Sequence, residues 1–225
     1  ATMKAAKESG ADAVKFQTFS ADLLVSPETQ KVEYQKQSGP NSETHYEMIK
    51  KLELSKDQHY DLFNFCCQVG LDFISTPYDI ESAKFLNKLG VKYFKTASAD
   101  IIDLPLLKYI ASTGKPTIIA TGMASLSEID KAVEVFEHYN NLNFALLHCV
   151  SNYPCSDKSL NMRVMNALKN SFDCPVGYSD HSIGFLASVI AVSLGARIIE
   201  KHFTLDKMSQ GPDHMASSSP DEFYE

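Results

Sequence analysis

Two histidines stand at matching positions in neighbouring apolar segments of the chain. One segment ends in His181 and the next in His202, and charged residues precede both rings, Asp180 and Lys201. In α/β barrels the chemistry lies at the C-terminal ends of the strands, where imidazoles from adjacent strands can converge on one divalent metal ion. Acidic groups and water would complete the coordination. The alternative is that each histidine is a buried strand-end residue whose ring is hydrogen-bonded to a neighbour.

Polar side chains also gather at the ends of the other apolar segments. Lysine supplies a point charge and hydroxyl groups supply short donors, so these residue types at one rim are suited to hold a phosphate and a carboxylate. Each one alone has a structural alternative, because a lysine can snorkel, an aspartate can cap a helix, and an aromatic ring or a histidine can pack in the core. The residues are Lys15, Gln17, Ser75, Thr76, Lys95, Ser98, Asp100, Thr121, His148, Ser151 and Tyr153.

A repeating unit positions these residues: an amphipathic helix, a glycine, one to three residues and an apolar strand. Helix starts are predicted by capping boxes that begin at Ser55 and Ser125 and by the N-cap residues Asp79 and Asp103. The strands are almost continuously apolar, which is typical of parallel strands covered on both faces. They are expected near residues 13–18, 71–76, 93–97, 116–121, 143–149, 175–179 and 197–202.

This alternation predicts an α/β fold, a (β/α)8 TIM barrel that lacks its first strand in this chain. The chain opens inside a helix at residues 1–9, before any strand. An open doubly wound sheet would carry a glycine-rich phosphate-binding turn after its first strand, and no loop contains GxGxxG or GxxxxGK[ST]. The polar segment 20–44 is expected to be either a lid over the barrel mouth or a disordered excursion.

Composition limits the partners and the compartment. A formal charge of -7 and a pI near 5.5 argue against a nucleic-acid-binding or acidic-membrane surface. Five cysteines without a CxxC spacing indicate reduced thiols in a cytosolic protein. The sequence has neither an apolar run that could cross a bilayer nor the apolar core of a signal peptide, so a cytoplasmic protein is expected.

The motifs together resemble one known family. The chain resembles the sialic acid synthases, which condense phosphoenolpyruvate with amino sugars, and their legionaminate and pseudaminate synthase relatives. The resemblance covers essentially the whole chain, and SDH, KHFTLD and GPD are its most diagnostic motifs. The matching segments are KFQTF at 15–19, FISTP at 73–77, FKTAS followed by Asp100, STGKP at 112–116, ATGM at 120–123, LLHCVSNYP at 146–154, GYSDHSIG at 177–184, EKHFTLDK at 200–207 and GPDH at 211–214.

The resemblance implies a role for each matching residue. His181 and His202 would be the two protein ligands of a divalent metal, Mn²⁺ or alternatively Mg²⁺ or Co²⁺, and they and Tyr153 would lie at the reacting centre. Gln17, Asp100 and Asp213 would contact the amino sugar. Phosphoenolpyruvate would be held by Lys15, Thr76, Lys95, Ser98, Ser151 and Ser179.

The chain also departs from the family pattern. Family members begin with an AEIGxNHxG-like first strand whose glutamate serves in acid–base catalysis, and they end in an antifreeze-like domain that reaches into the partner subunit's site. Residues 1–225 therefore match the catalytic barrel alone, and the full-length protein is expected to be a homodimer. Asp100 stands where many bacterial members have glutamate, which leaves the identity of the sugar open.

The expected reaction joins phosphoenolpyruvate to an N-acylated mannosamine-type sugar and gives a nonulosonic acid and phosphate. N-acetylneuraminate and N,N'-diacetyllegionaminate are the two products considered, and phosphorylation of the sugar is left open. One alternative is a Schiff-base aldolase with Lys95 or Lys201 as the nucleophile. The other is a catalytically silent barrel that binds a sugar.

Overall fold

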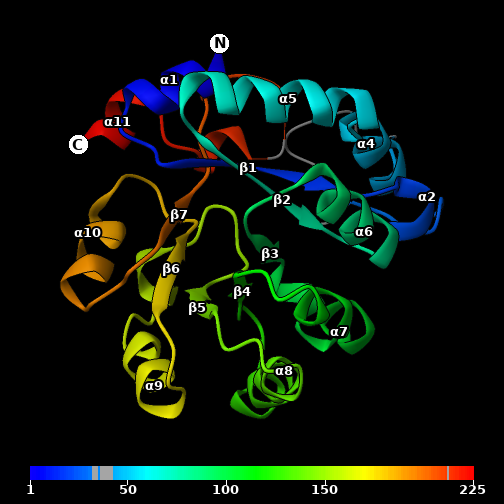
Figure 1. Ribbon diagram of the computed structural model, residues 1–225. Helices are drawn as coiled ribbons and strands as arrows, with labels where there is room; N and C mark the ends of the chain where they lie inside the picture. Colours follow the sequence, from blue (N-terminus) through cyan, green and yellow to red (C-terminus); the bar gives the residue numbers. More distant parts are fainter. Residues whose placement is uncertain (32–34, 36–42, 212) are drawn as a thin grey trace.

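The computed structural model describes residues 1–31, 35, 43–211 and 213–225, and these form an α/β fold of parallel strands (Figure 1). The expected lid segment 20–44 falls partly outside the described residues. The strands are β1 (Ala13–Thr18), β2 (Asp72–Pro77), β3 (Phe94–Thr96), β4 (Thr117–Ala120), β5 (Phe144–Cys149), β6 (Val176–Asp180) and β7 (Ile199–Lys201).

Helices precede and follow the strands and lie around the outside of the barrel (Figure 1). The α-helices are α1 (Thr2–Glu8), α2 (Ala21–Leu24), α4 (His45–Leu52), α5 (Lys56–Val69), α6 (Ile80–Leu89), α7 (Leu104–Ser112), α8 (Leu126–His138), α9 (Val164–Ser171), α10 (Leu186–Ser193) and α11 (Pro220–Tyr224). Short 3-10 turns are η1 (Ser98–Ile102), η2 (Asp157–Ser159) and η3 (His214–Ala216).

The helix boundaries have local causes that the sequence predicts. Ser55 and Ser125 form complete capping boxes at the starts of α5 and α8, and Asp79 and Asp103 accept backbone N–H groups at the starts of α6 and α7. Gly70 ends α5 with φ 72°, a left-handed conformation that glycine adopts without strain. These predicted boundaries are confirmed.

The described strands are ordered β1-β2 in one parallel sheet and β3-β4-β5-β6-β7 in another. The two sheets meet at β2 and β3, where Tyr93 Oη donates to Asp72 Oδ2 at 3.1 Å. Together the strands curl into an arc, with β7 and β1 at its two ends (Figure 1). A side-chain ion pair joins these end strands, since Lys15 Nζ lies 3.3 Å from Glu200 Oε2.

The main core lies between the strands and the surrounding helices. Phe94, Ile119 and Leu146 of three neighbouring strands and Leu86 and Leu107 of α6 and α7 are fully buried in one apolar cluster. This packing explains the apolar runs of the strands, because parallel strands covered by helices have little contact with water on either face. The C-terminal ends of the strands stay together at one end of the barrel.

Candidate functional site at the strand ends

The last two strands bring both predicted histidines to the same side of the sheet. Ser179 of β6 is the register partner of Glu200 of β7, and its Oγ donates to Glu200 Oε1 at 2.7 Å. His181 and His202 each follow two residues later and therefore continue on the same face. The ring centroids of the two histidines are 5.6 Å apart.

The His181 ring is held in one orientation. Its Nδ1 lies 2.7 Å from the carbonyl oxygen of Val150, so Nδ1 must donate and Nε2 carries the lone pair. Nε2 lies 3.3 Å from Ser179 Oγ. Tyr153 packs against both imidazoles, with centroid distances of 4.1 Å to His181 and 5.5 Å to His202. Tyr153 therefore lies at the centre of the site.

Burial keeps both imidazoles neutral. It lowers the pKa of His181, and it lowers the pKa of His202 to about 3 together with the positive charge of Lys15. A metal-binding imidazole must be neutral, so both rings are available to a cation near neutral pH. Among the described side chains, no group of three or more His, Cys, Asp or Glu residues could hold a metal ion. A divalent ion held by the two histidines would therefore need its other ligands from substrate and water.

Beside the histidines, one carboxylate holds two lysines. Lys95 Nζ lies 3.7 Å from Glu200 Oε2, the oxygen that also pairs with Lys15. Burial raises the pKa of Glu200, but the positive charges of Lys15 and Lys95 lower it by more. The net shift is therefore downward, and the carboxylate is ionised. Burial lowers the pKa of Lys95, and Glu200 partly opposes this effect. The cluster concentrates positive charge next to the histidines, where an anion could bind.

Hydroxyl groups converge around Gly122, in the turn after β4. A methyl group built on Gly122 would lie 2.8 Å from each of Ser98 Oγ, Ser151 Oγ and Cys149 Sγ. Ser98 Oγ accepts the Gly122 backbone N–H at 3.1 Å and lies 3.0 Å from Cys149 Sγ. Only glycine leaves room for this arrangement, which gathers two of the predicted phosphoenolpyruvate ligands.

Thr76, another predicted phosphoenolpyruvate ligand, carries an unused hydroxyl. Its Oγ1 is buried and has no hydrogen-bond partner within the described part of the chain. A buried hydroxyl without a partner is costly, and binding of a ligand would remove that cost. An unpaired buried hydroxyl is therefore expected where a substrate group is to be bound.

The predicted sugar ligands lie at three positions around this centre. Asp213 Oδ2 is 3.8 Å from His202 Nδ1, and Asp100 Oδ2 accepts the backbone N–H of Ala97 at 3.2 Å. Burial raises the pKa of Asp100 to about 6, and it raises the pKa of Asp213 as well. Gln17 is exposed on β1, two residues after Lys15 and therefore on the same strand face. Pro212 of the GPDH motif lies outside the described residues.

Two polar residues of the strand ends are structural. His148 Nε2 donates to the carbonyl oxygen of Leu160 at 2.7 Å, which confirms that it is a core histidine. Lys201 lies on the opposite side of β7 from the site, where its Nζ is 2.9 Å from Asp180 Oδ2. Its amino group is occupied there, so the structure does not favour Lys201 as a Schiff-base nucleophile.

Sequence reasoning missed Glu200, Gly122 and Cys149 as parts of the site. A usable signal existed for Glu200, because strand periodicity places a residue two positions before His202 on the same face. No comparable pattern identifies Gly122 or Cys149. Their importance depends on side chains from β3, β4 and β5 that meet only in the folded chain.

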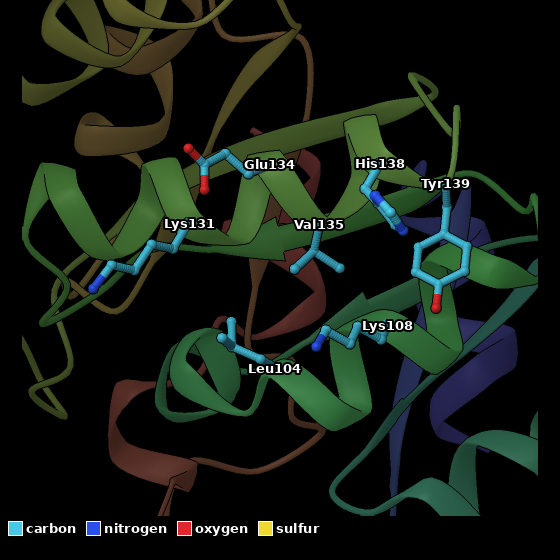
Figure 2. Close-up of a pocket in the computed structure, with 7 residues that line it drawn as sticks. All are labelled: Leu104, Lys108, Lys131, Glu134, Val135, His138 and Tyr139. Carbon is cyan, nitrogen blue, oxygen red and sulfur yellow. The ribbon is translucent and has the colours of Figure 1, made fainter.

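A separate surface cavity of about 310 Å³ lies between α7 and α8 (Figure 2). Leu104 and Lys108 of α7 face Val135 and His138 of α8 across it. None of the predicted site residues lines this cavity, and it belongs to the outer helix layer rather than to the strand ends. We therefore assign the candidate site to the strand ends.

Known proteins match the chain over nearly its whole length. A family model described as the NeuB family matches residues 2–225. The chain is 50% identical over 222 residues to the N,N'-diacetyllegionaminic acid synthase of Legionella pneumophila, covering 97% of this chain and 62% of that protein. It is 45% identical over 219 residues to the enzyme of the same name from Campylobacter jejuni, covering 96% of this chain and 66% of that protein. The chain thus spans about two thirds of these relatives.

A solved structure has the same fold. The N-acetylneuraminic acid (sialic acid) synthetase from Leptospira borgpetersenii, crystallised with citrate, superimposes with a TM-score of 0.87 at 34% sequence identity. The match covers 99% of this chain and 73% of that one. In the described residues, no helix is long and apolar enough to cross a membrane.

Proposed function

This chain belongs to the NeuB family, and on that premise we propose that its strand-end site condenses phosphoenolpyruvate with an N-acylated mannosamine-type sugar. The products would be a nine-carbon 2-keto acid and phosphate. One observation carries the proposal: two neutral histidines lie beside two lysines that share the Glu200 carboxylate. The two histidines suit a divalent cation, and the two lysines suit a trianionic substrate.

Each part of the site has a task in this reaction. Lys15 and Lys95 would face the charges of phosphoenolpyruvate, while the hydroxyls of Thr76, Ser98 and Ser151 would donate to its oxygens. The hydroxyl of Ser179 would exchange its bond to Glu200 Oε1 for one to the substrate. A divalent ion, Mn²⁺ or alternatively Mg²⁺ or Co²⁺, would be held by His181 and His202 and would supply Lewis acidity for the sugar aldehyde. Gln17, Asp100 and Asp213 would hold the sugar hydroxyls and amides.

The bond changes balance with one water. The C3 carbon of phosphoenolpyruvate attacks the aldehyde carbon of the open-chain sugar, and the aldehyde oxygen becomes a hydroxyl. Water adds to C2, and the C2–O bond to phosphate breaks, which leaves the keto group. The two protons of the water go to the former aldehyde oxygen and to the departing phosphate. Tyr153, packed on both imidazoles, would exclude other water from the reacting carbons. Positioning and preorganised charge would provide most of the rate.

We propose N,N'-diacetyllegionaminic acid as the product. Two relatives with this name share 50% and 45% of their matched residues with the chain. The sugar substrate would then be 2,4-diacetamido-2,4,6-trideoxymannose. The test offers this sugar and N-acetylmannosamine separately to the full-length protein with phosphoenolpyruvate and Mn²⁺, and identifies the product by mass. A higher kcat/KM with N-acetylmannosamine would contradict the assignment.

If the protein were a Schiff-base aldolase, Lys95 would remain a candidate nucleophile, because burial lowers the pKa of its amino group. Borohydride reduction in the presence of pyruvate separates the two reactions. A condensing enzyme yields no covalent adduct, whereas an aldolase yields a reduced adduct on Lys95. A silent sugar-binding barrel predicts sugar binding without phosphate release.

We also propose that the full-length protein is a homodimer in the cytoplasm, which light scattering of the purified protein and cell fractionation would test.

A further inference from the structure

A buried ion pair lies directly behind the two histidines, on the other face of β6 and β7. Lys201 Nζ is 2.9 Å from Asp180 Oδ2, and their side chains are 4% and 0% exposed. The preceding residues, Ser179 and Glu200, bond to each other on the inner face. Alternation along the strands therefore turns Asp180 and Lys201 away from the substrate side.

The ion pair closes a ring of hydrogen bonds around the His181 backbone. Asp180 Oδ1 accepts both the backbone N–H and the hydroxyl of Ser182, at 2.8 Å and 2.7 Å. Lys201 Nζ donates to the Ser182 carbonyl oxygen at 2.7 Å, and Ser188 of α10 donates to Asp180 Oδ2 at 2.7 Å. Asp180 and Ser182 flank His181, so the chain on both sides of this imidazole is tied to β7 and to α10.

The pairing of β6 with β7 links these hydrogen bonds to the positions of the two histidines. Asp180 and Lys201 are direct partners in the β6–β7 ladder, and each immediately precedes one of the histidines. A slip of one residue in either strand would turn its histidine to the outer face. A buried ion pair adds little net stability relative to packed apolar residues, and its best-attested use is to specify geometry.

We propose that Asp180 and Lys201 are positioning residues that set the relative height and orientation of the His181 and His202 imidazoles for a shared divalent ion. The inference rests on the metal-binding part of the proposed function. Neither residue touches substrate, and each acts through the histidine that follows it. Outer partners that orient metal ligands typically change metal affinity by about 10- to 100-fold when they are removed.

The test measures Mn²⁺ affinity by calorimetric titration of the full-length protein. Asp180→Asn and Lys201→Met each break the ion pair, and both are expected to weaken Mn²⁺ binding by about tenfold or more. Lys201→Arg keeps the charge and should lose less Mn²⁺ affinity than Lys201→Met. The double variant D180N/K201M should bind no more weakly than the single variants, because both changes remove the same interaction.

A control separates positioning from a general loss of stability. Leu86→Ala opens a cavity under α6, away from β6 and β7, and should lower stability by about 2–5 kcal/mol. Its Mn²⁺ affinity should stay at the wild-type value. A second readout needs no metal: ¹⁵N spectra should give the Nδ1–H tautomer of His181 in the wild type, because Nδ1 donates to Val150. D180N and K201M should lose this single tautomer.

The outcomes distinguish the two proposals. Wild-type Mn²⁺ affinity in D180N and K201M, together with lost binding in His181→Ala, would overturn the positioning role and leave the metal site standing. Unchanged affinity in His181→Ala as well would overturn the metal site itself. If the single variants do not fold, the apolar pair D180L/K201M leaves no unpaired buried charge. Weak Mn²⁺ binding by that folded variant would support the inference, and wild-type binding would overturn it.

Discussion

Glu200 accounts for the presence of two lysines so close together at the strand ends. Lys15 and Lys95 approach the same carboxylate oxygen, at 3.3 Å and 3.7 Å, and would repel each other without it. Ser179 donates to the other carboxylate oxygen. Burial lowers the pKa of Lys95, and the Glu200 carboxylate opposes that shift.

Replacing Glu200 with Gln should shift the pH dependence of phosphoenolpyruvate binding. Burial lowers the pKa of Lys95 and Glu200 raises it, so removing the carboxylate lowers that pKa further. Lys95 then loses its proton at a lower pH, and the KM for phosphoenolpyruvate should begin to rise at a lower pH than in the wild type. Steady-state kinetics across the alkaline range measures this shift. Glu222→Gln, which removes a partner of Lys207, is the control. Identical pH profiles of KM for E200Q and the wild type would refute the role of Glu200 in raising the pKa of Lys95.

Gly122 should tolerate no side chain. In Gly122→Ala the new methyl group would meet Ser98, Ser151 and Cys149 at 2.8 Å, so these groups must move apart. The KM for phosphoenolpyruvate should rise by about tenfold, the effect of losing one or two well-placed hydrogen bonds. Ser125→Ala, three residues along, removes a helix cap and should cost about 1 kcal/mol of stability without changing KM. Equal KM values for G122A and S125A would contradict this role.

Asp100 should destabilise the folded protein as the pH rises. Its pKa is raised by burial from 3.8 to about 6, so the folded state binds this proton more tightly than the unfolded state. Stability contributed by the protonated form is present below the unfolded pKa and is lost as pH rises through the folded pKa. Asp100→Asn should therefore unfold at a higher temperature than the wild type at neutral pH and show no such gain near pH 4. Thermal unfolding at both pH values tests this, and an equal gain at both would contradict it.

At the scale of elements, local signals in the sequence were sufficient for most boundaries. The capping boxes at Ser55 and Ser125 and the glycine after α5 act within a few residues, so the sequence predicts them directly. The positions of the strand-end residues along their strands were also predictable. The contacts between strands were not, because the meeting of Glu200 with Lys15 depends on the closing of the arc from β1 to β7.

Gly177 tests the packing of β6 against β7. A methyl group here would lie 2.5 Å from the carbonyl oxygen of Ile198 and 2.6 Å from Leu147 Cδ2. Gly177→Ala should therefore lose more than about 3 kcal/mol, beyond the usual cost of overpacking. Gly70→Ala is the control, since its methyl group meets no atom within 4 Å and its left-handed conformation should cost about 1–2 kcal/mol. Chemical denaturation of both variants measures the difference, and equal losses would contradict the packing argument.

At the scale of the whole molecule, the order of helices and strands predicts the fold, and the site follows from it. Parallel strands must all end on one side of the barrel, so polar residues scattered from Lys15 to Asp213 come together there. The orientation of each side chain needed the structure. Lys201 illustrates this, since as a strand-end lysine it was a possible nucleophile until its contact with Asp180 placed it on the outer face.

The most direct measurement is phosphate release from phosphoenolpyruvate by the full-length protein, with and without Mn²⁺ and 2,4-diacetamido-2,4,6-trideoxymannose. The wild type should release phosphate only when both are present. His181→Ala should reduce the rate by about 100-fold or more, whereas His138→Ala on the outer helix α8 should match the wild type. Release that needs neither metal nor sugar, or that persists at the wild-type rate in His181→Ala, would contradict the proposed condensation at the strand ends.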